Sequence, residues 1–382
     1  MERNTEVITN KKRLLALGGT SVLLGASIVA CSPIAPAGDD DAAGDSVFEQ
    51  VQALPEDSRM DDLVKAAQEE GELTVYLRSD VVFEDIQSAF KEKYDIDITI
   101  ENPGLPTAVY QQIAEGSAAG QQRADVVETF SYELELNYPQ EDLVAPMPEF
   151  LKEAAPDPDL AGEYSTEVWS YPFLPVWNTN AVTGNNAPGS LEDFTKPVWT
   201  GKTVMAKGDF LWSWYRGTFE QYTQEEGMSV EEFEEMMTTI AANSEFADSS
   251  NPAAAGIASG EYNGGPNIAL TAAQKLEGDP PVAWEPTPEP AIAVPLGIAL
   301  INDAPHPNAA MLFTHWYLTE GADIVEAEQF MPQNENEADL DGVEIKRTDL
   351  TSMRPEEVEE WREAFTNLTS GKTPILPESV RG

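Results

Sequence analysis

The sequence Y-P-F-L-P-V-W-N-T-N, from Tyr171 to Asn180, decides the fold. It is apolar and aromatic, and Pro172 and Pro175 interrupt it. Because proline lacks an N–H and fixes φ, neither a helix nor a central ladder strand suits these positions. We interpret the stretch as an extended crossover between two lobes, which implies a cleft between them. The alternative is an ordinary edge strand inside one large domain.

A second apolar run mirrors the first. It reads A-I-A-V-P-L-G-I-A-L-I, spans Ala291–Ile301, and is broken by Pro295 and Gly297. A run of this kind could carry the chain back to the first lobe. The length of 382 residues suits two domains or one two-lobed unit better than a single simple core.

The segment after residue 70 has the order and length of a β-α-β unit. Leu73–Leu77 is rich in strand formers, and Ile96–Ile100 alternates apolar and polar residues with period two. Between them, helical spacing places four apolar residues on one face: Phe83, Ile86, Phe90 and Tyr94. This pattern predicts a parallel sheet with right-handed crossovers. It continues with a helix, a strand and a short strand at Thr107–Glu115, Ala124–Val127 and Asp142–Met147.

Ligands of open α/β sheets meet the loops beyond the carboxyl ends of the strands. This rule selects the residues after two predicted strands: Arg78, Ser79, Thr129 and Ser131. Arg78 stands out because basic residues are scarce and a helix N-terminus at this place would also favour an anion. The alternative for Arg78 is a weak surface ion pair.

The predicted second lobe contains the most aromatic stretch, F-L-W-S-W-Y-R-G-T-F-E-Q-Y. One helical face of it should pack on the sheet, while three residues near the helix start could face a ligand: Ser213, Trp214 and Arg216. Trp214 would offer a stacking or cation–π surface. Glu261 and Tyr262 in a glycine-bearing loop, and Trp284 in a predicted strand, complete the candidate ligand-binding residues.

Charge and composition exclude several classes of protein. The chain has 68 acidic and 22 basic residues, a formal net charge of −46, which repels phosphate backbones and disfavours nucleic-acid binding. An apolar content of 41% is enough for globular packing. So large a charge favours solubility and suits a salty or cation-rich medium, in which self-repulsion is screened.

Catalytic and metal-binding signals are missing from the sequence. Cys31 is the single cysteine, so an intrachain disulfide is impossible, and His306 and His315 are too few for a zinc site built on histidine pairs. The chain has neither a G-x-S-x-G elbow nor an H-E-x-x-H helix. We therefore predict no catalytic residues, no cofactor and no metal. A secreted, lipid-anchored hydrolase is the alternative.

The N-terminus resembles a bacterial lipoprotein signal peptide. Lys11-Lys12-Arg13 precedes an uncharged apolar run that ends in I-V-A-C, with Cys31 at the position of the lipidated cysteine. This resemblance implies a signal peptide and lipobox at 1–31 and, from its Pro, Gly, Ala and Asp content, a flexible tether at 32–56. The general secretory route is expected, because the Lys-Arg pair matches a twin-arginine signal only faintly. A plain cleaved signal peptide or a signal anchor is the alternative.

Several motifs along the chain resemble extracellular solute-binding proteins of ABC importers, in the group of ferric-ion, polyamine and phosphonate binders. They include G-E-L-T-V-Y, A-D-V-V, P-V-W-N-T-N-A-V, A-S-G-E-Y and P-L-G-I-A-L-I-N-D-A-P-H-P-N-A-A. The resemblance covers about residues 70–335 and implies an α/β, type II periplasmic-binding-protein fold. Lobe 1 would comprise 57–176 and 300–382, lobe 2 would comprise 177–299, and the two crossovers would form the hinge with Trp177, Asn178 and Pro295.

The implied function is a lipid-anchored receptor that captures a small solute between the lobes and delivers it to ABC permease subunits. It would act as a monomer at the extracellular face of the membrane or in the periplasm. A sensor or scavenger without a permease is a further alternative. Ferric binders of this group use an adjacent tyrosine pair, which this chain does not contain; Tyr262 stands alone in the corresponding region. A chelate, an organic anion, a phosphonate and a polyamine all stay open. Arg78 and Arg216 favour an anion, whereas Glu261, Glu285 and the aromatic residues favour a cation.

Overall fold

The computed structural model describes residues 46–78, 82–155, 157–208, 210–276, 278, 280–284, 290–327, 331–332 and 344–381. Cys31, Ser79 and Glu285, the predicted signal peptide and residues 32–45 of the predicted tether lie outside these ranges. The strands are β1 Glu72–Tyr76, β2 Asp97–Glu101, β3 Val126–Phe130, β4 Thr166–Asn178, β5 Thr203–Ala206, β6 Ser244–Ala247, β7 Gly264–Ala269, β8 Val282–Ala283, β9 Ala291–Leu300, β10 Met331–Pro332 and β11 Ile345–Arg347.

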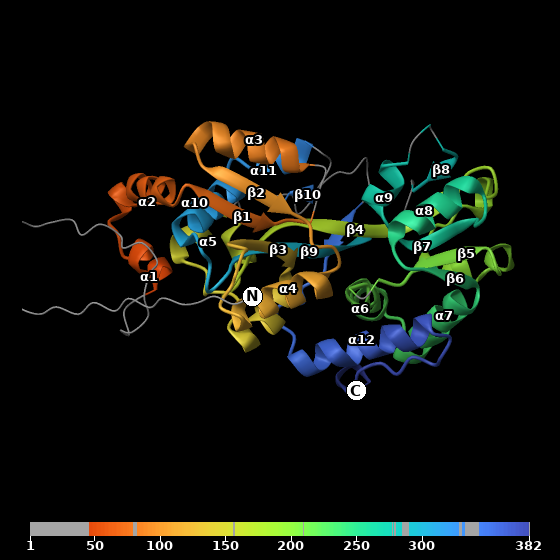
Figure 1. The fold of residues 1–382 in the computed structure, drawn as a ribbon. Coiled ribbons are helices and arrows are strands. Elements are labelled where there is room, and N and C mark those ends of the chain that lie inside the picture. The colour runs from red at the N-terminus through yellow and green to blue at the C-terminus, as the bar shows by residue number, and fades with distance from the viewer. Residues whose placement is uncertain are drawn as a thin grey trace, which may run out of the picture. The chain divides into compact units, whose positions relative to one another are not determined.

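Helices pack around this sheet (Figure 1). The α-helices are α1 Val47–Gln52, α2 Glu56–Glu70, α3 Phe83–Tyr94, α4 Pro106–Ala118, α5 Glu149–Ala154, α6 Trp212–Glu220, α7 Val230–Ala242, α8 Ser250–Ser259, α9 Leu270–Gln274, α10 Pro307–Leu318, α11 Ala322–Ala327 and α12 Pro355–Thr369. A π-helical turn, η2 Glu133–Asn137, follows β3, and another, η8 Gln221–Glu225, follows α6.

The described strands form one continuous sheet in the order β2-β1-β3-β9-β4-β7-β5-β6. In the first half, β1 pairs in parallel with both β2 and β3, as the β-α-β pattern predicts. In the second half, β5 pairs in parallel with β6 and β7. Each half is therefore an α/β unit with its own parallel strands, and the antiparallel strands β9 and β4 lie between them.

The two apolar runs form the long antiparallel pair that joins the halves. β9 pairs with β3 of the first half through Leu296–Leu300, and β4 pairs with β7 of the second half from Phe173 onward. Between these contacts, Ser170 and Tyr171 of β4 lie opposite Pro295 and Val294 of β9. This short stretch is the crossover itself. The crossover is therefore shorter than residues 171–180, and the expectation that Pro172 and Pro175 do not suit a central strand is wrong: β4 is paired with both β9 and β7. Pro175 is tolerated because it lies where the register with β7 shifts, between Leu174 and Val176.

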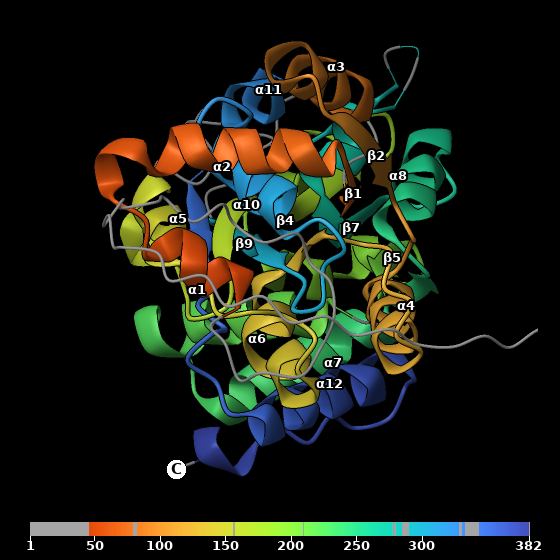
Figure 2. The same ribbon diagram turned by 60° about the vertical axis from the view of Figure 1, so that its left-hand side comes forward.

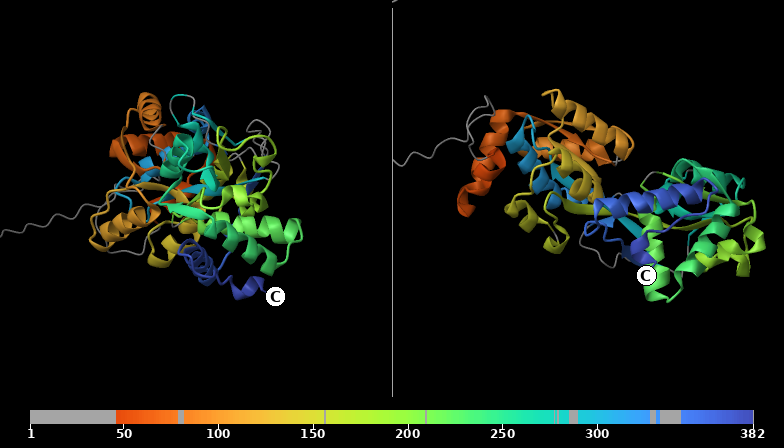
Figure 3. Two further views of the ribbon diagram at one scale, coloured as in Figure 1. Left: turned by 90° about the vertical axis from the view of Figure 1, so that its right-hand side faces the viewer. Right: turned by 90° about the horizontal axis from the view of Figure 1, so that it is seen from below.

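Helix α12 belongs with the second half, which corrects the prediction that 300–382 joins lobe 1. Its Trp361 ring lies 5.2 Å from Phe219 and 5.8 Å from Tyr215, both on α6. Phe365 also packs against Tyr215, at 5.9 Å. The aromatic face of this helix therefore packs on α6, while Arg362 of α12 pairs with Glu133 of the first half at 3.4 Å. Figures 2 and 3 show α12 beside α6 and α7.

Two further boundaries differ from the sequence predictions. Residues 46–56 are not all tether: Ser46 and Glu49 form a capping box that starts α1, whose Phe48 and Val51 are buried. Asp142–Met147 is not a strand, because only Val144 makes a β-bridge, to Ile301.

Candidate functional site

The carboxyl ends of β1 and β3 lie side by side and hold the best candidate for a solute site. The chain after β1 runs to α3 on one face of the sheet, whereas α4, which follows the neighbouring β2, lies on the other face (Figure 1). Open α/β sheets bind ligands beyond the strand ends where the direction reverses in this way, and we call the ligand position expected here the crevice. Arg78 follows β1, and Phe130 is the last residue of β3.

Arg78 is held in place at this crevice. Its backbone N–H donates to Glu128 Oε1 at 3.0 Å, and its Nη1 donates to the carbonyl oxygen of Gly104. The guanidinium carbon lies 5.6 Å from the ring centroid of Phe130, within cation–π range. Its Nε is buried and has no hydrogen-bond partner among the described residues. The cation is therefore oriented, with donor capacity to spare.

A buried carboxylate beneath the crevice fixes Arg78. Glu128 is 1% exposed and accepts from Trp169 Nε1 at 3.0 Å and from Tyr317 Oη at 2.7 Å, besides Arg78. Burial raises the pKa of Glu128 above its ordinary value, although these hydrogen bonds and Arg78 act in the opposite direction. The carboxylate links β3, β4 and α10, so the base of the crevice is rigid.

The second half supplies the opposing surface. The ring of Phe210, which follows β5, stacks on Phe130 with centroids 4.5 Å apart and 24° between the planes. Phe210 also lies 6.0 Å from Phe173 in β4. The end of β5 is fixed by Asn267 of β7, whose side chain donates to the Ala206 oxygen at 2.9 Å and accepts from the Ala206 N–H at 3.0 Å.

Two predicted site residues on β3 and after it point away from Arg78. Thr129 is inside β3, not in a loop, because it pairs with Gly297 of β9, and it is fully buried. Ser131 is 1% exposed and lines a cavity together with Pro295 on the other face of the crossover. Ser79 lies outside the described residues.

The three residues predicted near the start of α6 serve the second half internally. Ser213 is buried and donates to the Phe210 carbonyl oxygen at 2.5 Å, so it supports Phe210 without facing the crevice. Trp214 is 1% exposed. Arg216 pairs with Glu220 at 2.8 Å and donates to the Asp349 carbonyl oxygen at 2.9 Å.

Glu261, Tyr262 and Trp284 also lie away from the crevice. The first two occupy the loop between the end of α8 and the start of β7, at the edge opposite the strand ends, and Tyr262 Oη donates to Glu245 at 3.1 Å. Trp284 packs against the cluster that contains Leu174 and Leu270.

Two of the predicted hinge residues, Trp177 and Asn178, lie further along β4 than the crossover does. Trp177 and Asn178 pair with β7 and β8 at the far end of β4, and Asn178 Nδ2 donates to the Ile257 carbonyl oxygen at 2.7 Å. These contacts place both residues inside the second half. Pro295 does lie in the crossover, opposite Ser170.

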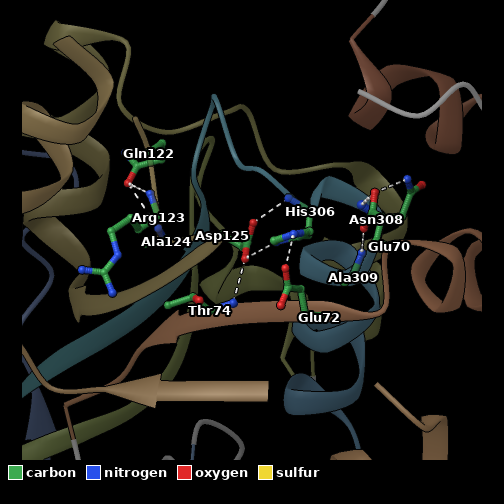
Figure 4. A network of polar contacts seen from close by, with 10 residues as sticks. All are labelled: Glu70, Glu72, Thr74, Gln122, Arg123, Ala124, Asp125, His306, Asn308 and Ala309. Carbon is green, nitrogen blue, oxygen red and sulfur yellow. Dashed lines mark hydrogen bonds and ion pairs between the residues drawn. The ribbon is translucent and has the colours of Figure 1, made fainter. Parts of the chain in front are cut away.

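The A-P-H-P-N-A-A segment forms a polar network at the opposite edge of the first half, at the amino ends of β1 and β3 (Figure 4). Asp125, fully buried, accepts from the N–H groups of Thr74 and His306, each at 2.7 Å, and contacts His306 Nδ1 at 3.1 Å. Glu70 caps α10 through the N–H groups of Asn308 and Ala309, at 3.1 and 2.7 Å. The segment therefore joins α2, β1, β3 and α10 and has a structural role.

Sequence reasoning did not assign Phe130 and Phe210 to the site. Both are aromatic residues near predicted strand ends, but the sequence predicts Phe130 in a loop and gives Phe210 no role beyond the first position of the most aromatic stretch. Among the described residues, no group of three or more His, Cys, Asp and Glu side chains could hold a metal ion. None of the described helices is long and apolar enough to cross a membrane.

The chain belongs to the bacterial extracellular solute-binding protein family, whose model matches residues 73–330. A search of curated proteins found no match. This assignment agrees with the resemblance drawn from the motifs, and it makes the chain a solute-binding protein and not a member of an enzyme family.

Solved structures of such proteins share the fold. The apo ferric ion-binding protein A of Pasteurella haemolytica has a TM-score of 0.60 at 14% identity, over 81% of this chain and 100% of that chain. Iron-bound HitA of Pseudomonas aeruginosa has 0.58 at 20% identity, over 78% and 97%. The spermidine/putrescine-binding protein PotD of Streptococcus pneumoniae has 0.58 at 16% identity, over 78% and 99%. The predicted class, two α/β lobes joined by crossover strands, is confirmed.

Proposed function

We propose that the protein captures a small solute in the crevice at Arg78, Phe130 and Phe210 and delivers it to an ABC permease. One observation carries this proposal: the stacking of Phe210 of the second half on Phe130 of the first, next to an oriented guanidinium. A solute held there would touch both halves and would link its binding to their relative position.

The solute of this proposal carries an anionic group, such as a carboxylate or a phosphonate. The Nε of Arg78 has no hydrogen-bond partner among the described residues, and guanidinium groups bind such anions with charge-assisted, often bidentate hydrogen bonds. The partly exposed ring of Phe210 would cover an apolar part of the solute, with the fully buried Phe130 behind it. Glu261, which favoured a cation in the sequence, lies at the opposite edge of the second half.

The lobes of this proposal follow the strand pairing. The first lobe comprises the elements of β1–β3 with α10, and the second comprises those of β5–β7 with 344–381. The crossover at Ser170–Phe173 and Ile292–Pro295 is the hinge.

We also infer that the protein is anchored outside the cell membrane through Cys31. The sequence around Cys31 supports this inference. Cys31→Ser should release the protein from the membrane fraction or block its maturation. Unchanged membrane attachment of that variant contradicts the anchor.

A thermal-shift screen of the full chain tests solute capture. The probes are carboxylates, phosphonates, ferric citrate, spermidine and sugars. A ligand that binds only the folded chain raises the melting temperature by linkage, by about 2.7 kcal/mol of stability at 100 times Kd. We expect an anion to give the largest rise. If none of the probes shifts the melting temperature while a chromogenic ester or glycoside is hydrolysed, the receptor proposal is wrong.

A further inference from the structure

A polar cavity of about 320 Å³ lies on the face of the crossover opposite the Arg78–Phe130–Phe210 crevice. The strand register shows this: Leu296 and Gly297 are adjacent on β9 and so point to opposite faces. Phe130 pairs with Leu296, whereas Glu167 of β4 pairs with Gly297. The cavity is lined by Glu167, Ser131, Glu135, Ser165, Pro295, Arg347 and Asp349, among others.

An ion pair crosses the hinge inside this cavity. Arg347 Nη1 lies 3.3 Å from Glu167 Oε2, and the two side chains are 13% and 12% exposed. Glu167 of β4 lies opposite Gly297 of β9. Gly297 in turn lies opposite Thr129 of β3, which belongs to the first half. Arg347 is on β11, opposite Ala293, beyond Pro295 on the side of the second half. The pair therefore joins the two sides of the hinge.

The segment that carries Arg347 is attached to the second half. Lys346, its neighbour, donates to Gln221 Oε1 at 3.2 Å and pairs with Glu225, both in the turn after α6. Arg216 of α6 donates to the carbonyl oxygen of Asp349, and α12, a few residues further on, packs on α6. A movement of the second half would therefore carry Arg347 with it and change its distance from Glu167.

We propose that Glu167 and Arg347 are positioning residues that set the balance between open and closed lobes, and through it the solute affinity, without touching the solute. This inference rests on the proposed function, in which solute binding is linked to lobe position. The pair acts from the back of the hinge, and the cavity gives water and protons access to it.

Protonation of Glu167 should shift this balance. Burial raises the pKa of Glu167 to about 7, although Arg347 acts in the opposite direction. The charged or titratable groups around the pair are Arg347 and Asp349 of the C-terminal segment, Glu135 of η2, and Asp157 and Asp159 before β4. Asp349 adds to the rise in the pKa of Glu167.

The sign of the effect follows from linkage. An arrangement that raises a carboxyl pKa is favoured when the group is protonated and loses that advantage as pH rises through the raised pKa. Opening of the hinge would hydrate Glu167 and return its pKa toward 4.5. The population ratio of the present arrangement to the open one would then fall between pH 4.5 and about 7, by at most roughly tenfold per pH unit.

The test measures lobe separation without any solute. Spin labels are placed at Lys65→Cys on α2 and Thr238→Cys on α7, both exposed, in the full chain with Cys31→Ser. Electron–electron distance measurements then compare low and high pH. We expect the wild-type hinge to shift toward longer distances as pH rises, and Glu167→Gln, which mimics the protonated carboxyl, to keep the shorter distance throughout.

A matched control separates this role from ordinary charge loss. Glu357→Gln removes an Arg–Glu pair of the same length, 3.3 Å, on the exposed side of α12, and should follow the wild type. A distance that does not change with pH in the wild-type hinge, or a Glu167→Gln variant that still follows wild type, overturns the inference. Because no solute is used, either failure leaves the proposed solute capture standing, and failure of the solute screen leaves this test valid.

Discussion

The ring of Phe130 stacks on the ring of Phe210, and the two residues come from strand ends in different halves of the molecule. Their centroids are 4.5 Å apart. A change in the angle between the halves must separate these rings or slide one across the other. The pair is thus a direct contact through which a solute beside Arg78 would sense closure.

Removal of the Phe210 ring should weaken solute binding. Phe210→Ala loses an aromatic contact worth about 0.5–1.5 kcal/mol beyond area burial, and it loses the cover over the crevice. We expect the Kd of the best anion from the screen to rise by about tenfold, measured by calorimetric titration. Phe150→Ala is the control. It removes a ring whose centroid lies 5.3 Å from the guanidinium carbon of Arg59, outside the site. An unchanged Kd for Phe210→Ala contradicts the proposed site.

Loss of the Glu128 carboxylate should destabilise the whole fold. Glu128→Ala leaves the Trp169 indole, the Tyr317 hydroxyl and the Arg78 N–H without their acceptor. Loss of the acceptor of a buried donor costs about 1–3 kcal/mol, so the unfolding free energy should fall by roughly 1–3 kcal/mol. Urea unfolding measures this change.

The control for Glu128 is Glu101→Ala. Glu101 is part of a partly exposed pair with Arg123 at 3.5 Å, so its loss should cost less than about 1 kcal/mol. Equal losses for the two variants would show that the buried network adds nothing.

The fold followed from the sequence where the signals are local. Proline breaks at 172 and 175 excluded a helix, and the periodicity between Leu73 and Ile100 indicated a β-α-β unit, as the structure has it. Helix α12 shows the limit. Amphipathic spacing does not say which surface an apolar face covers, and the face of α12 covers α6.

The candidate site was predicted only in part because it depends on long-range pairing. The sequence predicts Thr129 in a loop. In the structure Thr129 pairs with Gly297, far along the chain, and therefore lies inside β3. Arg78 was found because the end of β1 is set locally. Phe210 was not, because its role comes from contact with Phe130 in the other half.

Stability should depend on the protonation of His306. The hydrogen bond between His306 Nδ1 and the Asp125 carboxylate, which acts as acceptor, raises the pKa of His306 above its ordinary value, and Glu72 adds to this. A raised histidine pKa stabilises the fold fully below the unfolded value of 6.5, and the gain is lost as pH rises through the folded pKa. Unfolding free energy should therefore fall as pH rises from 6.5 through the raised pKa of His306, a range in which Glu167, with a pKa of about 7, completes its own ionisation.

His306→Gln tests this assignment. The variant should be less stable than the wild type at low pH and should lose the pH dependence above 7, while Glu167→Gln keeps it. Parallel pH profiles for wild type and His306→Gln would place the titrating group elsewhere.

High salt should stabilise the protein. A net charge of −46 opposes compaction by self-repulsion, and salt shortens the Debye length from about 10 Å at 0.1 M to about 3 Å at 1 M. We expect the melting temperature to rise over this range of potassium chloride. Sucrose at equal osmolality controls for general exclusion effects. A melting temperature that is constant or falls with salt is incompatible with this prediction.

The most direct test of the central claim is a calorimetric titration of the best anion into the wild type, Arg78→Gln and Arg59→Gln. Both arginines lie over a phenylalanine ring, at 5.6 and 5.3 Å, but only Arg78 lies at the crevice. Our account predicts that Arg78→Gln raises Kd by about tenfold or more, the value of a lost charge-assisted hydrogen bond, while Arg59→Gln leaves it unchanged. Equal affinity of the wild type and Arg78→Gln would contradict capture of an anionic solute at this site.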